Sequence, residues 1–342
     1  MHVLVTGHTG FKGAWATLLL RQRGYRVSGL ALDPLVGSLF ERAKLTDSLE
    51  HDLRVDIRDG GAVLEAVRDV EPDLVLHMAA QPLVRTSYEQ PRWTMETNVL
   101  GTLSVLEAIS ATASVRAAVM VTTDKVYRNT GQSEGYEEHD ALGGRDPYSA
   151  SKAMADILIS SWEASFPGSP VAIARAGNVI GGGDVSADRL LPDLLRAFGT
   201  RKPATIRNPD AVRPWQHVLD CLNGYLLLID ALVRDEGTGA WNFGPQSSSF
   251  RTVRDVADRA ADRWGEEASW VAEGGDHPHE EAVLTLDASR ARRELGWQDA
   301  LDFQESIEWT VDWTKRVQSG ESALQVTKDQ IAAFDDRIGA VS

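Results

Sequence analysis

A glycine-rich turn close to the start of the chain constrains the fold more than any other feature. The apolar run Val3–Thr6 leads into residues 7–13, which read GHTGFKG, and the amphipathic stretch Phe11–Arg23 begins inside that motif. Glycines spaced in this way between a strand and a helix permit a tight turn and let the backbone approach a pyrophosphate at the helix N-terminus. The spacing therefore predicts dinucleotide binding, with a plain tight turn as the alternative. The residues expected to contact the dinucleotide here are Gly7, Thr9, Gly10, Phe11, Lys12 and Gly13.

Short apolar runs alternate with amphipathic stretches through the first half of the chain. Strands are expected at Val3–Thr6, Arg26–Ala31, Leu53–Asp56, Leu74–His77, Ala117–Thr122 and Val171–Arg175. Helices are expected at Phe11–Arg23, Gly61–Asp69, Arg92–Ser110 and Ser149–Phe166. Such alternation is typical of a parallel sheet covered by helices on both faces. We therefore predict an α/β fold built on a Rossmann-type doubly wound parallel sheet.

The alternation stops after Arg175. Residues 181–183 are all glycine, and prolines follow at 192, 203, 209 and 214, which indicates loops among shorter elements. The expected division is a dinucleotide-binding domain at 1–175, with 212–243 added to it, and a smaller C-terminal substrate-binding lobe at 176–211 and 244–342.

Composition excludes several classes of partner. Hydrophobic residues make up 43% and charged residues 25% of the 342-residue chain, as in ordinary globular proteins. The formal net charge of -15 disfavours nucleic acid and anionic membranes as partners. No apolar run is long enough for a membrane span and the sequence shows no secretory signal, so a cytoplasmic location is expected. A single cysteine, Cys221, leaves no partner for a disulfide or a cysteine-based metal cage. We expect it to be a buried structural thiol, and we expect no metal site.

Further residues of the cofactor site are expected where the strands end. Asp33 lies 20 residues beyond Gly13, just after the second strand, where a carboxylate accepts hydrogen bonds from the adenosine ribose and repels a 2′-phosphate. That placement favours NAD over NADP, although Asp33 also precedes Pro34 and suits a turn. The remaining residues expected near the cofactor are Asp56, Ile57, Ala79, Ala80, Gln81, Asn98 and Thr122.

A tyrosine and a lysine one helical turn apart form the candidate catalytic pair. Tyr148 and Lys152 have the spacing YxxxK at the start of a predicted helix, so both side chains lie on one helical face. A tyrosine with its ordinary pKa of about 10 is a poor base at neutral pH. A nearby ammonium and the positive charge of a nicotinamide ring both favour the phenolate. We predict that Tyr148, assisted by Lys152, removes a proton from a substrate hydroxyl.

Three polar residues follow the fifth predicted strand. In an open α/β sheet the C-terminal ends of the strands line the ligand crevice. Thr123 is therefore expected to hydrogen-bond the substrate hydroxyl beside Tyr148, with Asp124 and Lys125 facing the substrate. The alternative is a surface ion pair in a turn.

Together these features resemble the extended short-chain dehydrogenase/reductase family, and the resemblance covers nearly the whole chain. Several long segments are similar to its CDP-glucose 4,6-dehydratase group, namely residues 7–13, 31–34, 39–41, 79–85, 123–125, 142–148, 175–184 and 213–219. One residue departs from the group, because Val185 stands where a tryptophan usually follows Asp184. This departure bears on the identity of the substrate more than on the type of reaction.

The resemblance implies an internal redox dehydration of a nucleotide sugar with NAD. Tyr148 takes the proton of the sugar 4-hydroxyl while hydride passes from C4 to NAD, water is lost across C5 and C6, and hydride returns to C6. By analogy, Asp124 protonates the departing 6-hydroxyl. Related dehydratases usually have glutamate at the position of Lys125, and a protonated ammonium cannot abstract the C5 proton. Either Lys125 is neutral, or it stabilises the enolate and another group is the base.

The resemblance also implies partners for the chain. The substrate contacts expected from it are Arg85, Ser87, Asn178, Arg189, Arg207, Arg213 and Gln216. Among these, Arg207 and Arg213 suit the diphosphate, since guanidinium groups match phosphate oxygens; exposed solubilising arginines are the alternative. A homodimer or a dimer of dimers is expected to form through Arg92–Ser110 and Ser149–Phe166. The functions left open are a C4 epimerase, a dehydratase acting on a different nucleotide sugar and a non-catalytic NAD-binding protein.

Overall fold

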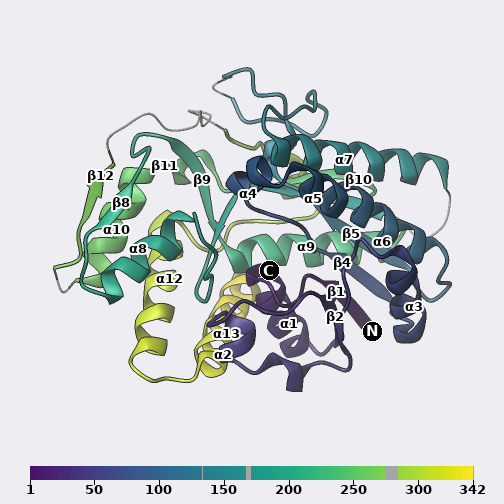
Figure 1. Cartoon of the computed structure of the whole chain (residues 1–342), viewed down its shortest axis with the longest axis horizontal. Helices are drawn as coiled ribbons and strands as arrows, with labels where there is room; N and C mark the ends of the chain where they lie inside the picture. Colours follow the sequence, from purple (N-terminus) through teal and green to yellow (C-terminus); the bar gives the residue numbers. More distant parts are fainter. Residues whose placement is uncertain (133, 167–170, 266, 274–283, 342) are drawn as a thin grey trace.

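The computed structural model describes residues 1–132, 134–166, 171–265, 267–273 and 284–341. Figure 1 shows a large layered part on one side and a smaller part on the other, with the two in contact along the middle of the molecule. Within the described residues, no helix is long and apolar enough to cross a bilayer.

The larger part is built on seven strands that pair in parallel, in the order β10-β6-β5-β4-β1-β2-β3. Their bounds are β1 His2–Thr6, β2 Arg26–Ala31, β3 Asp52–Arg54, β4 Leu74–His77, β5 Ala117–Val121, β6 Val171–Ala176 and β10 Gly239–Phe243. All six strands expected from the sequence are present, with ends shifted by up to two residues. The predicted α/β fold with a doubly wound parallel sheet is confirmed.

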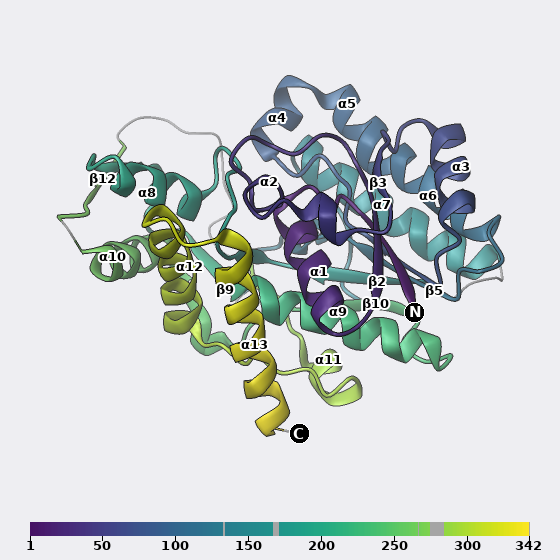
Figure 2. The same cartoon turned by 90° about the horizontal axis from the view of Figure 1, so that it is seen from below.

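Helices cover both faces of this sheet (Figure 2). One face carries α1 Phe11–Gln22, α9 Val218–Val233 and α13 Ala323–Val341, and the other carries α3 Gly60–Val70, α6 Gly101–Ser110 and α7 Pro147–Ser165. Alternate residues of β1 serve the two layers: Val3 and Val5 pack in the core beneath α1 and α9, whereas Leu4 packs in the core beneath α3 and α6. Because side chains alternate across a strand, burial on both faces requires the unbroken apolar runs seen in the sequence.

The helix expected at Arg92–Ser110 is distorted in its middle. It begins as α5 Pro91–Met95, passes through a π-helical segment η2 Glu96–Leu100, and continues as α6. Extra residues inserted into a helix in this way often occur at functional sites. Here the distorted segment contains Asn98, whose side chain lies beneath the candidate site.

The smaller part combines two short sheets with three helices. Its strands pair in the orders β11-β9-β7 and β12-β8. The bounds are β7 Asn178–Ile180, β8 Ala204–Ile206, β9 Val212–His217, β11 Phe250–Thr252, β12 Trp270–Ala272, α8 Leu190–Gly199, α10 Val253–Trp264 and α12 Phe303–Gln318. A separate apolar core lies among these elements.

The chain passes between the two parts more often than the expected division implies. Within 212–243, β9 lies in the smaller part, whereas α9 and β10 belong to the layers of the large sheet. Within 244–342, α11 Ser289–Glu294 packs against β10, and α13 packs against α1. The polar C-terminal tail is thus a helix docked on the larger part.

Candidate active site

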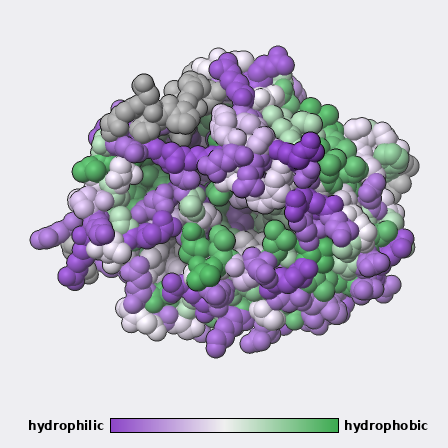
Figure 3. Space-filling model, viewed as in Figure 1, coloured by the Kyte–Doolittle hydropathy of each residue, from purple (hydrophilic) through white to green (hydrophobic). Residues whose placement is uncertain are grey.

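A cavity of about 950 Å³ lies between the two parts. Its wall includes the glycine turn, the C-terminal ends of β4 and β5, the start of α7 and the segment from Ala176 to Leu194. Figure 3 shows a hollow near the centre of this face of the molecule, with apolar patches beside it. The volume and the mixed lining are those of a site for a small molecule or a cofactor.

The glycine turn fits the pyrophosphate of a dinucleotide. Gly7 has a φ of +74°, and a Cβ there would lie 2.8 Å from the Ala79 nitrogen; a Cβ at Gly13 would lie 2.1 Å from the Gly7 carbonyl oxygen. Side chains at these two positions are therefore excluded by the close packing of β1, α1 and β4. Gly10 precedes α1 and gives the helix no side-chain cap, so the N-terminus of α1 is open to the cavity.

The other residues expected at the cofactor site differ in their placement. Asp56 and Ile57 line the cavity, as do the three residues after β4, which are Ala79, Ala80 and Gln81. Asp33 is outside the lining: its side chain is 89% exposed and pairs with Arg54 at 3.3 Å. Its contact with the adenosine ribose stays a prediction.

The start of α7 brings the tyrosine and the lysine into the cavity wall. Asp146 caps the helix by accepting a hydrogen bond from the Ser149 N–H at 2.9 Å, and Pro147 occupies the first turn. Tyr148 and Lys152 are both buried and both line the cavity. The Lys152 ammonium donates to the Val121 carbonyl at 3.1 Å, which ties the helix to the end of β5.

Burial dominates the protonation of this pair. It raises the pKa of Tyr148 to about 12, against the opposing influence of the Arg189 charge and of a hydrogen bond with Thr123. Burial also lowers the pKa of Lys152 to about 8, and the nearby Lys12 ammonium lowers it further. The cation that lowers the pKa of Tyr148 here is Arg189, on the smaller part, whereas the expected effect of Lys152 on Tyr148 stays a prediction. Phenolate formation requires a further positive charge, which an oxidised nicotinamide ring supplies.

The three polar residues after β5 form a short turn, η3 Asp124–Val126. Thr123 caps this turn, and its hydroxyl donates to Asp124 Oδ1 at 2.9 Å. Asp124 is 1% exposed, and its Oδ2 has no hydrogen-bond partner among the described residues. Thr123, Asp124 and Lys125 all line the cavity. A buried carboxyl oxygen without a protein partner is suited to meet a polar group of a ligand.

The residues expected to hold the substrate divide into two sets. Five of the seven line the cavity, namely Arg85, Asn178, Arg189, Arg207 and Arg213. The structure does not bring Ser87 and Gln216 into the lining. Ser87 accepts a hydrogen bond from the Tyr148 N–H at 3.1 Å, and the Gln216 amide donates to the Phe243 carbonyl at 2.9 Å. Both side chains therefore support the backbone around the site.

Most of the chain matches a family of nucleotide-sugar enzymes. The family model described as GDP-mannose 4,6 dehydratase covers residues 4–310. The chain belongs to this family. It is 43% identical to a CDP-glucose 4,6-dehydratase of Salmonella typhimurium, over 97% of this chain and 95% of that protein. It is 30% identical to a dTDP-glucose 4,6-dehydratase of Xanthomonas campestris pv. campestris, over 91% of this chain and 92% of that protein.

Solved structures of related enzymes have the same fold. The UDP-glucose 4-epimerase of Thermus thermophilus in complex with NAD superposes with a TM-score of 0.78 at 27% identity, covering 92% of this chain and 99% of that one. A dTDP-glucose 4,6-dehydratase from Streptomyces venezuelae with NAD bound superposes with a TM-score of 0.81 at 25% identity, covering 95% of this chain and 100% of that one. The chain is therefore an NAD-dependent nucleotide-sugar 4,6-dehydratase, and the predicted cofactor and reaction class are confirmed.

A buried polar network behind α7 was not foreseen from the sequence. Asp156 accepts two hydrogen bonds from the Arg175 guanidinium, at 2.6 and 2.9 Å, and a third from the Thr122 hydroxyl at 2.9 Å. Arg175 also donates to the Tyr127 hydroxyl at 2.8 Å. Asp156 follows Lys152 by one helical turn, so the spacing 148, 152, 156 was the available signal. This network fastens α7 to the ends of β5 and β6.

A second network supports the same helix from its other side. The Asn98 amide donates to Ser151 Oγ at 2.9 Å and to the Gln81 carbonyl at 3.0 Å, and its oxygen accepts from the Gln81 N–H at 2.8 Å. Asn98 is therefore outside the cavity lining, and it acts on the site through Gln81 and α7.

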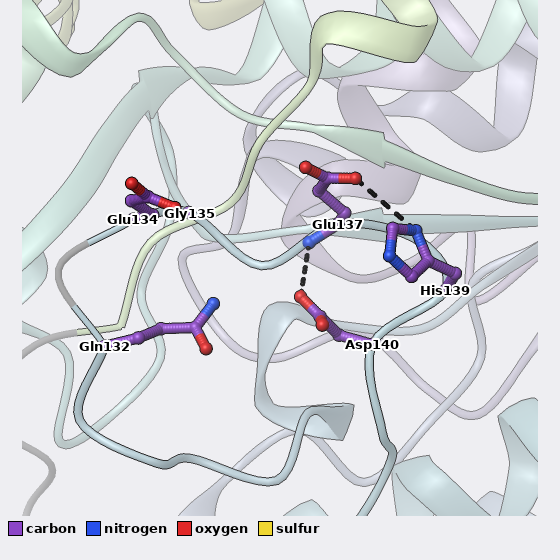
Figure 4. Close-up of a pocket in the computed structure, with 6 residues that line it drawn as sticks. All are labelled: Gln132, Glu134, Gly135, Glu137, His139 and Asp140. Carbon is purple, nitrogen blue, oxygen red and sulfur yellow. Dashed lines mark hydrogen bonds and ion pairs between the residues drawn. The ribbon is translucent and has the colours of Figure 1, made fainter.

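A separate hollow of about 420 Å³, drawn in Figure 4, shares no lining residue with the cavity described above. It is lined by Gln132, Glu134, Gly135, Glu137, His139 and Asp140. The Glu137 N–H donates to Asp140 at 2.9 Å, and His139 approaches the Glu137 carboxylate at 3.4 Å. These polar groups satisfy one another at the surface, and the hollow contains none of the residues expected to act in the dehydratase reaction.

Proposed function

We propose that the chain converts CDP-glucose to CDP-4-keto-6-deoxyglucose with loss of one water. Asp124 carries the proposal. Its carboxyl group is buried in the cavity wall, is hydrogen-bonded to Thr123 and has one oxygen without a hydrogen-bond partner in the described part of the chain. A C4 epimerase has no need of an acid at this place, because it loses no water. The choice of a cytidine nucleotide is supported by the 43% identity to a CDP-glucose 4,6-dehydratase.

In the proposed reaction, the residues of the chain move protons at three positions of the sugar. Tyr148, held by its hydrogen bond with Thr123, takes the proton of the 4-hydroxyl. The 4-ketone makes the C5 hydrogen acidic, and a base removes it as Asp124 gives its proton to the departing 6-hydroxyl. The base exchanges this proton with solvent and then protonates C5, and the proton held by Tyr148 replaces the one that Asp124 lost. When bound, NAD supplies the hydride chemistry, taking a hydride from C4 and returning it to C6.

The cofactor is proposed to lie along the glycine turn and the ends of β4 and β5. Gly7, Gly10 and Gly13 leave room for the pyrophosphate at the N-terminus of α1. Lys152 is proposed to orient the ribose beside the nicotinamide, since its ammonium is already fixed to the Val121 carbonyl. Arg207 and Arg213 are proposed to bind the diphosphate of the substrate from the smaller part.

Mass spectrometry and deuterium incorporation test the function directly. The purified protein, incubated with CDP-glucose in deuterated water, is expected to give a product that has lost the mass of one water and carries deuterium at C5. A product of unchanged mass with inverted C4 would identify an epimerase instead. The same assay with UDP-glucose, dTDP-glucose and GDP-glucose tests which nucleotide the substrate carries. Faster turnover of any of these overturns the proposed substrate.

Variants of the two residues after Thr123 separate the steps. Asp124→Asn is expected to retain C4 oxidation and to lose dehydration by about 10²–10⁴ in rate. Lys125→Ala is expected to abolish exchange of the C5 hydrogen if Lys125 is the base, and to slow that exchange only moderately if it stabilises the enolate. An Asp124→Asn protein that dehydrates at the parent rate removes Asp124 from the mechanism.

We also propose that the protein is a homodimer, alone or as half of a dimer of dimers. Large apolar side chains are exposed beside one another on the outer face of α7 and next to α6: Met154 is 49% exposed, Ile157 56% and Leu100 53%. Light scattering after size-exclusion chromatography measures the mass. Ile157→Glu is expected to release monomers, and a parent protein that elutes as a monomer contradicts the dimer.

A further inference from the structure

A single carboxylate links two arginines on opposite walls of the cavity. Arg85 lies in α4 Val84–Glu89 of the larger part, and Arg207 follows β8 in the smaller part. Asp188, in the loop before α8, accepts a hydrogen bond from the Arg85 guanidinium at 3.0 Å and lies 3.5 Å from that of Arg207. All three residues line the cavity. Asp188 thus joins the two parts across the space where the substrate must enter.

The backbone at Asp188 is fixed in an uncommon conformation. Its φ is +57°, in the left-handed region that residues other than glycine rarely adopt. Among those residues, aspartate and asparagine tolerate this region best. Such a residue persists only where the surrounding structure holds it, and it often marks a functional site. Here the conformation places the carboxylate between two guanidinium groups.

The charges around Asp188 are suited to an anionic ligand. Besides Arg85 and Arg207, the lining contains Arg189 and Arg213, in a chain whose net charge is -15. Asp193 is a second carboxylate nearby. Burial is the main cause of the raised pKa of Asp193, and the charge of Asp188 raises that pKa further. A phosphate group can replace a carboxylate between guanidinium groups, because each presents a pair of oxygens that can accept two parallel hydrogen bonds from a guanidinium.

We propose that Asp188 is an internal stand-in for a phosphate, which an anionic ligand must displace in order to bind. The inference rests on the proposed function only in taking that ligand to be a diphosphate-bearing nucleotide. In the free protein, Asp188 neutralises Arg85 and Arg207 and holds the two parts together. When a diphosphate enters, the two guanidinium groups exchange the carboxylate for phosphate oxygens. Asp188 therefore lowers the affinity for every diphosphate, whichever base it carries.

Calorimetric titration of the NAD-loaded protein with CDP, UDP and inorganic pyrophosphate tests this inference. Asp188→Asn removes the charge while keeping a side chain that tolerates the left-handed backbone. Because exposed ion pairs are individually weak, we expect the affinity for all three probes to rise by roughly threefold to tenfold. The KM for the nucleotide sugar falls by a similar factor, with kcat unchanged. Asp188→Gly, which suits the same φ, is a second variant in case the first folds poorly.

A matched control separates this effect from a change in net charge. Asp210 pairs with Arg254 at 3.1 Å, and neither residue lines the cavity. Asp210→Asn changes the net charge equally and is expected to leave all three affinities unchanged. Unchanged or weaker binding in both Asp188 variants overturns the inference, as does an equal gain in Asp210→Asn.

The outcomes also separate this inference from the proposed function. If CDP-glucose is not dehydrated while Asp188→Asn still binds CDP and pyrophosphate more tightly, the proposed function fails and the role of Asp188 stands. If CDP-glucose is dehydrated while the affinities do not change, only the role of Asp188 fails.

Discussion

The two walls of the cavity differ in how their charged groups are held. On the wall formed by β5 and α7, the Arg175–Asp156 pair is almost fully buried, with side chains 4% and 0% exposed. On the opposite wall, Asp188 of the smaller part is 38% exposed, and its partner Arg85, which reaches across from the larger part, is 47% exposed. Buried, fully hydrogen-bonded groups hold a fixed geometry, whereas exposed pairs exchange readily with water and ions. The comparison suggests that the first wall positions the reacting atoms and the second exchanges partners as the substrate comes and goes.

The largest effect is expected at the wall that positions the reacting atoms. Tyr148→Phe removes the phenolate oxygen proposed to accept the 4-hydroxyl proton, so turnover is expected to fall by about 10⁴. NAD binding and the melting temperature are expected to stay near those of the parent, since the ring remains packed. Single-turnover detection of reduced cofactor is the measurement. Oxidation of C4 at the parent rate would remove Tyr148 from the chemistry.

Breaking the buried pair behind α7 tests whether the fixed geometry matters. Asp156→Asn leaves the Arg175 guanidinium buried without its counter-charge, and a loss of about 3–5 kcal/mol in the free energy of unfolding is expected. Asp156 also favours the protonated form of Lys152, so the substitution lowers the Lys152 pKa below its value of about 8. The alkaline limb of the rate profile is then expected to move to lower pH.

The pH profile distinguishes positioning from general instability. Asp193→Asn is the control, because Asp193 pairs with Arg196 on the exposed wall, at 2.7 Å. An Asp156→Asn protein that is less stable but has an unshifted alkaline limb shows that the network is structural only.

The exposed wall is expected to affect binding and to leave the chemistry unchanged. Arg207→Gln removes one of the proposed diphosphate ligands, so KM is expected to rise about tenfold with kcat nearly constant. The change is opposite in sign to that expected for Asp188→Asn. Steady-state kinetics at several salt concentrations measures it. A fall in kcat with KM unchanged would place Arg207 on the chemical side of the comparison.

Local patterns in the sequence were enough to predict the larger part and the placement of Tyr148 and Lys152 at the start of a helix. The glycine turn, the apolar runs and the spacing of Tyr148 and Lys152 are each set by neighbouring residues, and each appears in the structure where it was expected. The same reasoning did not place Ser87 or Gln216. Their orientation depends on contacts with Tyr148 and Phe243, which are distant in the sequence.

Electrostatic effects on the pair were also out of reach of the sequence. Lys12 lowers the pKa of Lys152, and Arg189 lowers that of Tyr148, because folding brings these cations together from the glycine turn and the smaller part. The contacts of Asn98, in the π-helical segment, were out of reach for the same reason. Its side chain donates hydrogen bonds to Gln81 in the loop after β4 and to Ser151 in α7. Only the packed structure supplies such contacts.

The smallest effect is expected outside both walls, at Asp220 in the first turn of α9. Its Oδ1 accepts a hydrogen bond from the Ala300 N–H at 2.7 Å, and its Oδ2 has no partner among the described residues. Burial raises the pKa of Asp220 from 3.8 to about 8, and the charges of Asp299 and Glu305 act in the same direction. The backbone N–H groups of Ala300 and Leu301 have the opposite effect and lower it. The folded protein therefore keeps a proton that the unfolded chain releases above pH 3.8, so this stabilisation declines as the pH rises from 3.8 and is fully lost above about 8.

Between pH 7 and 9 this loss is expected to lower the free energy of unfolding by about 1 kcal/mol. Asp220→Asn keeps the acceptor for Ala300 and cannot ionise, so its stability is expected to stay level over the same range. Urea unfolding at each pH compares the two proteins. Parallel curves would mean that Asp220 does not titrate there. If the curves diverge while kcat remains the same in both, then a buried carboxyl group can govern stability without acting on either wall of the cavity.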